Sequence, residues 1–358
     1  MTHPFTPSPF RPAWWLPGGH LQTLGGKYLR NPPSLPLRRH RLDTPDGDFL
    51  DLDFGPGPNE GGLADGRSGP GPRDGGPLDL DFGPDPDPRQ PLVLILHGLE
   101  GFSRRPYVLH TMAALAAQGL ASACLNFRSC SGEPNRVPRM YHSGETGDPE
   151  LVLRILRERW PGRPLGALGF SLGGNVLLKL MGEREDGGLG LLRAAVAISV
   201  PYDLDAGATY LERGPLGPRY SRYFVDSLKG KVRAKEHLLA PLLDLEAVYG
   251  ARTIREFDER ATAPLHGFRD ATDYYRRSSS GRYLEGIRVP TLLVHAHDDP
   301  FLPPASIPHG IQDRNPALTT AFVRRGGHVG FVSGTAPGRP RFWAEAEAGR
   351  FLAGRLGA

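Results

Sequence analysis

A G-x-S-x-G motif, Gly169-Phe170-Ser171-Leu172-Gly173, constrains the fold of this chain more than any other stretch. It follows the apolar run 165–168, which predicts a buried strand, and it precedes apolar residues at 176–181, whose spacing favours a buried helix. A strand, a sharp turn and a helix in this order lift the serine clear of a sheet, and the glycines let the two elements approach closely. The chain contains 47 glycines, so a chance match is the alternative, and the flanking strand and helix patterns argue against it.

A serine hydroxyl is a weak nucleophile that needs a histidine to take its proton and a carboxylate to orient that histidine. Both types of residue follow Ser171 in the chain. Asp298 and Asp299 come after the apolar run 289–295, and His328 lies in a glycine-rich loop. The order nucleophile, acid, histidine is typical of the α/β-hydrolase fold and differs from the orders of the best known serine protease folds. We therefore expect an α/β protein with a mostly parallel central sheet flanked by helices.

The remaining apolar runs outline that sheet. Residues 39–54 predict an N-terminal β-hairpin, because two alternating segments flank an Asp-Gly turn. Its expected inward-facing residues are Leu50, Leu52 and Phe54, and its expected outward-facing residues are Asp51 and Asp53. Further strands are expected at 92–96, 121–127, 165–168, 194–200, 289–295 and 321–323, and helices at 108–118, 150–160 and 342–356.

The chain is long enough to bury a large core, and we expect a single α/β domain over residues 39–358. An N-terminal arm, residues 1–38, precedes it, and its two adjacent tryptophans predict an extended segment pinned onto the body. Between about 201 and 285 the strand pattern stops and helical spacing takes over, which predicts a helical cap over the carboxyl edge of the sheet. Ordinary peripheral helices are the alternative.

A nine-residue phrase occurs twice near the hairpin. It reads LDLDFGPGP at 50–58 and LDLDFGPDP at 78–86, with Gly, Pro, Asp and Asn between the copies. Two copies are too few for a repeat architecture. The duplication therefore predicts an exposed, flexible Gly/Pro-rich insertion at about 55–90.

Composition excludes several other classes of protein. The net charge is +4, but acidic residues are scattered throughout, so no basic block favours nucleic-acid binding. Cys124 and Cys130 are too few for a disulfide framework, and reduced thiols in a cytoplasmic protein are the expectation. The N-terminus has no signal-peptide pattern, and no apolar run approaches the roughly 18 residues of a transmembrane helix.

Several longer phrases make the interpretation more specific, and they extend from about Trp14 to the C-terminus outside the insertion. They are GGHLQT, HGLEG, NFRSCSGEPN, YHSGET, GFSLGGN, REFDERATAPLHGF, DYYRR, DDPFLP and GGHVGF. In these phrases the chain resembles the YheT-type subfamily of α/β hydrolases, whose eukaryotic relatives are membrane-anchored esterases, lipases and phospholipases. The resemblance implies a carboxylic ester hydrolase that needs no cofactor.

The resemblance also implies the role of each residue. Ser171 matches the family's nucleophile, His328 its general base and Asp299 its acid, because Asp299 has the family's spacing to the hydrophobic-Pro pair that follows. Asp298 is then expected to cap a turn or to support the site from behind. The oxyanion hole is expected to consist of the backbone N–H groups of Leu99 and Leu172.

The other histidines are open to more than one interpretation. His97 is expected to brace the loop before Leu99, and His20 is either a pocket residue or, as we favour, a structural one. His142 and His266 approach the site or organise loops, and the sequence favours neither. The histidines at 295 and 297 lie beside two aspartates, but no H-E-x-x-H helix or cysteine pair accompanies them, so no metal is expected.

Together these observations predict a serine hydrolase that cleaves short- to medium-chain acyl esters through an acyl-enzyme intermediate. The expected substrate is a small-molecule acyl ester, and a bilayer lipid is less favoured because no membrane anchor is expected here. An acyltransferase with the same triad and an alcohol acceptor is one alternative. A non-catalytic binding protein on the same fold is the other, and the presence of all three triad residues argues against it.

Overall fold

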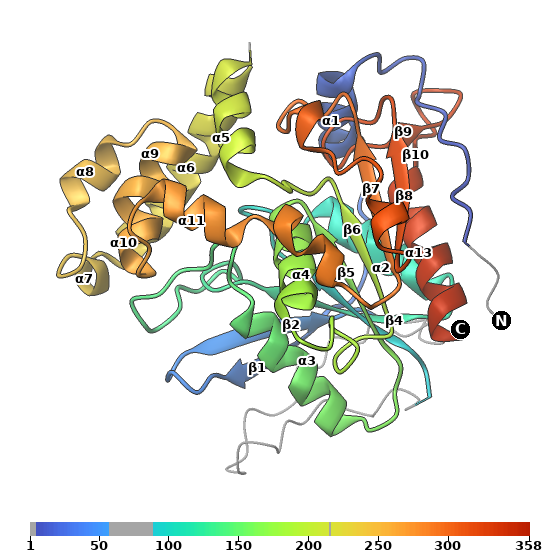
Figure 1. Ribbon diagram of the computed structural model, residues 1–358, viewed down its shortest axis with the longest axis horizontal. Helices are drawn as coiled ribbons and strands as arrows, with labels where there is room; N and C mark the ends of the chain where they lie inside the picture. The colour runs from blue at the N-terminus through green and yellow to red at the C-terminus, as the bar shows by residue number, and fades with distance from the viewer. Residues whose placement is uncertain (1–4, 57–88, 215) are drawn as a thin grey trace.

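The computed structural model describes residues 5–56, 89–214 and 216–358, and its centre is an eight-stranded sheet (Figure 1). The strands are β1 Arg38–Asp43, β2 Phe49–Phe54, β3 Leu92–Leu96, β4 Ala121–Asn126, β5 Leu165–Phe170, β6 Ala194–Ile198, β7 Thr291–Ala296 and β8 Leu318–Val323. Their order in the sheet is β1-β2-β4-β3-β5-β6-β7-β8. Strand β2 pairs antiparallel with both β1 and β4, and all the other neighbouring strands pair in parallel. The predicted fold class and hairpin are thus confirmed. Most of the predicted insertion, residues 57–88, lies outside the described residues.

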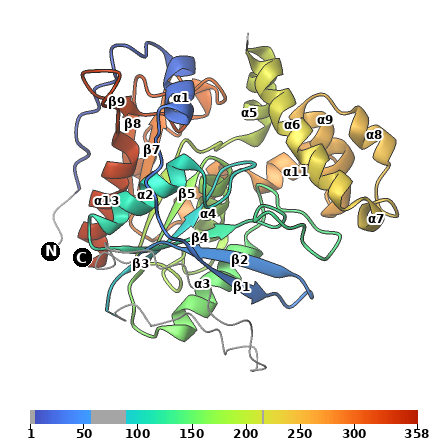
Figure 2. The same ribbon diagram turned by 180° about the vertical axis from the view of Figure 1, so that it is seen from behind.

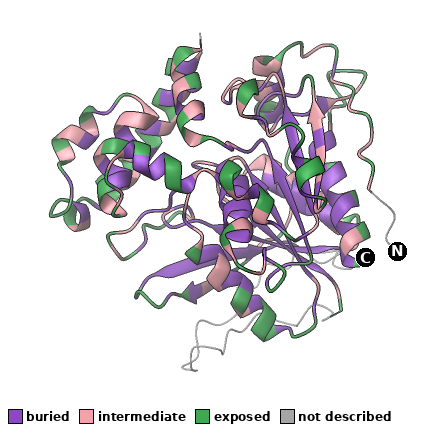
Figure 3. Ribbon diagram, viewed as in Figure 1, coloured by how far each residue is buried: buried purple, intermediate pink, exposed green. Residues whose placement is uncertain are grey.

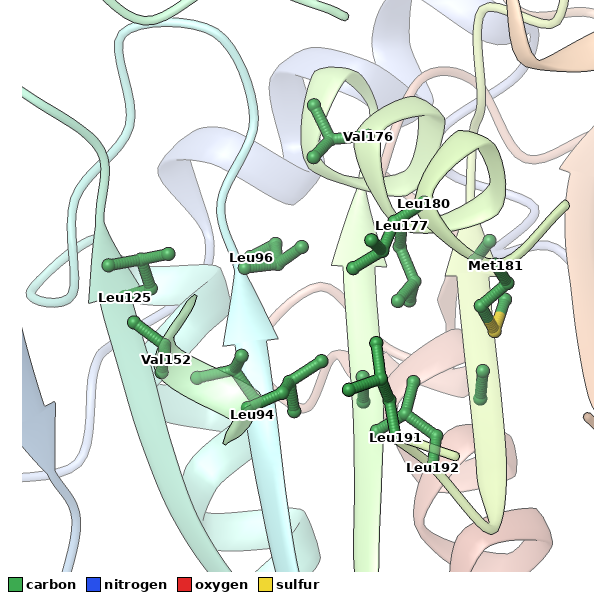
Figure 4. Close-up of a cluster of buried hydrophobic side chains, with 14 of the residues drawn as sticks. Leu94, Leu96, Leu125, Val152, Val176, Leu177, Leu180, Met181, Leu191 and Leu192 are labelled. Atoms are coloured by element: carbon green, nitrogen blue, oxygen red, sulfur yellow. The ribbon is translucent and has the colours of Figure 1, made fainter. Parts of the chain in front are cut away.

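Helices cover both faces of the sheet (Figures 1 and 2). On one face lie α3 Gly147–Arg159 and α4 Leu172–Glu183, and on the other lie α2 Pro106–Ala116 and α13 Trp343–Leu356. The central strand β3 is apolar throughout because it is buried on both faces. Its Leu94 and Leu96 pack with side chains of α3 and α4 (Figure 4), and its Val93 and Ile95 pack on the opposite side against α2 and α13.

The prediction that Asp51 and Asp53 face solvent is wrong, since their exposed fractions are 1% and 2%. Strand β2 lies between β1 and β4, so it has no open edge. Two arginines of β1 cover the carboxylates: Arg41 donates to Asp51 at 2.8 and 2.9 Å, and Arg39 donates to Asp53 at 2.8 Å. Charged groups that are paired in this way can stay buried, so the alternation of apolar and charged residues in β2 did not identify a face exposed to solvent.

The N-terminal arm is also not extended throughout, because it contains helix α1 Gly19–Tyr28. Three glycines lower its helix propensity, which explains why the sequence did not predict a helix here. The structure gives one of them a reason: a Cβ on Gly26 would lie 2.7 Å from the Cα of Gly330. The two tryptophans do contact the body through their indole N–H groups, Trp14 with the carbonyl of Thr335 at 3.1 Å and Trp15 with that of Gly334 at 3.3 Å.

Between β6 and β7 the chain forms a helical segment at one side of the sheet, which we call the cap, residues 204–286 (Figure 1). Its inward surfaces are buried and its outer surfaces exposed (Figure 3), and a cluster that includes Val225, Val232 and Phe257 forms its core. The cap elements are α5 Leu204–Arg213, α6 Gly217–Ala234, α7 Glu236–Leu239, α8 Leu245–Gly250, α9 Ile254–Phe257, the π-turn Asp258–Thr262, α10 Ala263–Leu265, α11 Ala271–Ser278 and the 3₁₀ turn Ser280–Gly286. Outside the cap, the short elements are a 3₁₀ turn Pro304–Ser306, α12 Ile311–Arg314, β9 Val332–Ser333 and β10 Arg341–Phe342.

Candidate active site

The carboxyl ends of the parallel strands bring the candidate residues to one edge of the sheet. Leu96 of β3 pairs with Gly169 of β5, and Ile198 of β6 pairs with Phe170. The loops that follow these strands therefore leave the sheet side by side. In open α/β sheets this edge is where ligands bind.

Ser171 sits on the sharp turn between β5 and α4, with φ 50° and ψ −116°. A positive φ is unfavourable for a residue with a Cβ, so the surrounding packing must hold the turn. A Cβ on Gly169 would lie 2.5 Å from the carbonyl oxygen of Gly173, and a Cβ on Gly173 would lie 2.4 Å from that of Leu96. The two motif glycines are therefore required where strand and helix nearly touch.

A chain of hydrogen bonds links Ser171, His328 and Asp299. The Nε2 of His328 lies 2.9 Å from the Oγ of Ser171, and its Nδ1 lies 2.7 Å from the Oδ2 of Asp299. Because a carboxylate only accepts, Nδ1 carries the proton and donates to Asp299, which leaves Nε2 free to accept from the serine hydroxyl. This is the tautomer that a general base needs.

The two adjacent aspartates have different partners. Asp299 is almost fully buried, and besides contacting His328 it accepts from the backbone N–H of Phe301 at 2.8 Å. Asp298 instead accepts from the N–H groups of Gly326 and Gly327, at 2.7 and 2.9 Å. Asp299 thus orients the imidazole, whereas Asp298 shapes the loop that carries it.

Helix α1 holds the other side of the His328 loop, which the sequence did not predict. The Oγ1 of Thr23 accepts from the N–H of His328 at 2.8 Å and donates to the carbonyl of Gly19 at 2.7 Å.

Two more side chains hold the segment that follows His328. The side-chain amide of Gln22 accepts from the N–H of Val332 at 2.8 Å and donates to its carbonyl at 3.2 Å. Arg30, just beyond α1, donates to the carbonyl of Val329 at 2.9 Å. The phrase GGHLQT therefore belongs to the machinery that places His328.

The candidate oxyanion groups lie on two turns beside Ser171. Leu172 is the first residue of α4, where helical N–H groups have no intrahelical partner, and Leu99 follows Gly98 in the loop after β3. A Cβ on Gly98 would lie 3.3 Å from the Cβ of Ser171, so this loop passes directly beside the candidate nucleophile. The next residue, Glu100, has φ 56° and is buried.

The cap reaches this oxyanion loop through an ion pair. Lys231 of α6 donates to the Oε1 of Glu100 at 2.8 Å, and the hydroxyl of Tyr141 donates to the same oxygen at 2.6 Å. Burial works against the charged forms, but it is outweighed: Lys231 lowers the pKa of Glu100, and Cys130 and Glu100 together raise the pKa of Lys231. Lys231 also lies 2.8 Å from the sulfur of Cys130, but burial raises the pKa of that thiol to about 11, so Glu100 is the charged partner.

A cavity of about 610 Å³ opens beside Ser171 between the core and the cap. Its lining is mainly apolar and includes Met140, Leu228, Phe257 and Leu265. Ser171, His328, Leu99 and Leu172 all line it, so the candidate nucleophile, base and oxyanion groups face one space.

Two histidines and an aspartate add polar groups to that lining. His142 and His266 lie with their rings 4.4 Å apart, and burial lowers the pKa of both, to about 4 for His266. Asp258, on the π-turn, accepts from the hydroxyls of Thr262 at 2.7 Å and Tyr275 at 2.8 Å, and burial raises its pKa to about 6. Both His142 and His266 line the cavity, which is one of the two positions that the sequence left open for them.

The other histidines considered from the sequence lie away from the Ser171 hydroxyl. His97 accepts from the N–H of Phe127 at 3.2 Å, and burial lowers its pKa to about 3. His20 lies outside the cavity and contacts the hydroxyl of Tyr220 on the cap at 3.3 Å.

The two histidines beside Asp298 and Asp299 do not form a metal site. His295 is buried in β7, and the ring of residue 297 stacks on His309 with centroids 5.0 Å apart. Across the described ranges, no group of three or more His, Cys, Asp or Glu is placed to hold a metal ion.

Sheet order, nucleophile turn and triad order together are those of the α/β hydrolases. A family model described as alpha/beta hydrolase fold matches residues 91–335, which is more than half of the chain. In the described part of the chain, no helix has the length and apolar character to cross a membrane.

Individual relatives narrow the assignment from the α/β hydrolases as a whole to one subfamily. A protein of Escherichia coli (strain K12), YheT, named as a candidate esterase, is 35% identical over 91% of this chain and 87% of its own length. Phospholipase ABHD3 of Mus musculus is 30% identical over 93% of this chain and 76% of its own. A monoacylglycerol lipase of Saccharomyces cerevisiae is 33% identical over 72% of this chain and 58% of its own. The chain belongs to the YheT-type subfamily of the α/β hydrolases.

Proposed function

We propose that the protein is a serine-dependent carboxylic ester hydrolase. The observation that carries the proposal is the chain of hydrogen bonds from Ser171 through His328 to Asp299. Ser171 lies on a strained turn and faces an apolar cavity. Relatives named as an esterase, a phospholipase and a monoacylglycerol lipase support ester hydrolysis.

The proposed reaction has two halves. His328 takes the hydroxyl proton of Ser171 as the oxygen attacks the ester carbonyl, and the backbone N–H groups of Leu99 and Leu172 stabilise the resulting oxyanion. His328 then gives that proton to the departing alcohol, which leaves an acyl-enzyme. In the second half His328 takes a proton from a water molecule as that water attacks the acyl carbon. The bond from the acyl group to the Oγ of Ser171 then breaks, the carboxylic acid leaves, and His328 returns the proton to Oγ.

The cavity supports acyl esters as the substrate class. Its volume of about 610 Å³ lies within the range of roughly 300 to 1,000 Å³ that is usual for small-molecule sites. Its apolar walls favour burial of a hydrocarbon chain by about 0.8 kcal/mol per CH₂ group. A short- to medium-length acyl chain is therefore the proposed occupant.

A series of p-nitrophenyl esters of increasing acyl length, assayed with the wild type and with Ser171→Ala, tests the proposal. We expect hydrolysis by the wild type, with kcat/KM rising with chain length until the cavity is full. Loss of Ser171 is expected to lower kcat by about 10³-fold or more. Equal hydrolysis by the Ser171→Ala variant would show that another group is the nucleophile.

A further inference from the structure

The rim of the cavity has a different character from its walls. Among the lining residues, those that are exposed to solvent are Lys27, Tyr28, Arg219 and Tyr223. Tyr28 and Tyr223 have exposed fractions of 69% and 47%, so they lie where the cavity meets solvent. The rim thus combines two cations with two tyrosines and contains no carboxylate.

The rim residues come from two helices that face each other across the opening. Lys27 and Tyr28 end α1, and Arg219 and Tyr223 lie one turn apart on α6. The Nζ of Lys27 lies 4.6 Å from the ring centre of Tyr223, which joins the two sides.

The two rim cations have no acidic partner among the residues that the structure describes. Within residues 5–56, 89–214 and 216–358, neither Lys27 nor Arg219 forms an ion pair with a carboxylate. The acidic residues of the lining are Glu100, which pairs with Lys231, and Asp258, which is buried and accepts from two hydroxyl groups. The opening therefore presents uncompensated positive charge and hydroxyl donors above an apolar space.

We propose that this rim binds an anionic group, a phosphate or carboxylate, in the part of the ester that projects from the cavity. The preferred substrate is then an acyl ester with an apolar chain and a negatively charged alcohol moiety. This inference rests on the proposed ester hydrolysis and names its substrate class. Phosphate and carboxylate oxygens accept from ammonium, guanidinium and phenol groups, so the four rim side chains provide suitable donors.

The expected size of the preference follows from the exposure of the rim. An exposed ion pair contributes a factor of about 1.4 to 5 in an equilibrium constant, so two together give about tenfold. Because the charges are exposed, the preference is expected to fall when the ionic strength rises from 0.05 to 0.5 M, as screening at the rim increases.

Two monomeric esters that differ by one phosphate group provide the test. They are 1-octanoylglycerol and 1-octanoylglycerol 3-phosphate, and the measured quantity is the ratio of their kcat/KM values, anionic over neutral. The wild type is expected to prefer the anionic ester about tenfold, and Lys27→Gln/Arg219→Gln is expected to bring the ratio close to one. Arg222→Gln is the matched control, because Arg222 is an exposed cation of α6 that does not line the cavity.

The outcomes separate this inference from the function on which it rests. A wild-type ratio near one would overturn the rim proposal and leave ester hydrolysis intact. An equal fall of the ratio in Arg222→Gln would also overturn it, since general surface charge would then be responsible. Faster hydrolysis of the neutral ester only when vesicles of anionic lipid are added would assign the rim to a lipid surface and contradict substrate selection. If the wild type cleaves neither ester and no p-nitrophenyl ester, the proposed hydrolase function itself fails.

Discussion

Replacing Lys231 with methionine tests whether the cap holds the oxyanion loop through a buried ion pair. The side chains of Lys231 and Glu100 have exposed fractions of only 17% and 3%, and their charged atoms are 2.8 Å apart. Without the ammonium group, Glu100 keeps only the hydroxyls of Tyr141 and Ser227 as side-chain partners. Removing one partner of a buried ion pair typically lowers the free energy of unfolding by about 3 to 5 kcal/mol. We expect Lys231→Met to lie at the lower end, about 3 kcal/mol, because the two hydroxyls still stabilise the Glu100 carboxylate.

Urea denaturation measures this loss. With a slope of about 3 kcal/mol per molar urea, a loss of about 3 kcal/mol lowers the midpoint by about 1 M. The double variant Lys231→Met/Glu100→Gln leaves no unpaired charge, so we expect it to be about 2 kcal/mol more stable than the sum of the single effects. We also expect kcat to fall in Lys231→Met with little change in KM, because Leu99 lies on the loop that Glu100 anchors.

The ion pair between Lys231 and Glu100 stabilises the folded protein only within a defined pH range. The pKa of Glu100 is below its ordinary value in the folded state, so its contribution is present above the unfolded pKa and is lost as the pH falls through the lower, folded value. The pKa of Lys231 is raised, so its contribution is present below its ordinary value of about 10.4 and is lost at still higher pH. Single effects that add within about 0.5 kcal/mol at pH 7 would refute the ion-pair account.

Three further predictions follow from the site. Asp299→Asn is expected to lower kcat by about 10³- to 10⁴-fold because it destabilises the required imidazole tautomer, while Asp298→Asn, which loosens only the loop, lowers it by about tenfold; equal losses in steady-state assays would contradict the assignment. Thr23→Val is expected to lower kcat about tenfold at unchanged KM, and Thr23→Ser to restore it, because only the hydroxyl fixes the His328 amide; an equal loss in both variants would point to packing instead. Since burial raises the pKa of Asp258 to about 6, the folded state favours its protonated form and the wild type loses stability as the pH rises from about 4 to 6. Asp258→Asn should therefore be up to about 3 kcal/mol more stable than the wild type at pH 7.5 and equal to it near pH 4, as thermal or urea unfolding at both pH values can show.

The sequence predicted the sheet well because its strands carry a local signal. The run 92–96 is apolar throughout and must be buried on both faces, and the glycines around Ser171 identify the turn that follows β5. Chain order predicted an acid and a histidine at the same edge, because the parallel strands bring their carboxyl ends together there. The choice of Asp299 over Asp298 came from the resemblance to the family and its spacing.

Other features depend on contacts between distant segments, which leave no local pattern. The glycines of α1 lower its helix propensity and so conceal the helix in the sequence, but Gly26 is needed because it packs against Gly330, about three hundred residues later. Asp51 and Asp53 look like solvent-facing residues because their arginine partners belong to the neighbouring strand. The exposed rim of Lys27 and Arg219 arises only when α1 and the cap meet.

Labelling with a fluorophosphonate tests directly whether Ser171 is an activated nucleophile, because such a reagent phosphonylates a serine only where a neighbouring base activates it and an oxyanion hole is formed. We expect one adduct per chain, mapped by mass spectrometry to the peptide that contains Ser171, and a parallel loss of ester hydrolysis. Labelling at another residue, or full activity after Ser171 has been modified, would contradict it.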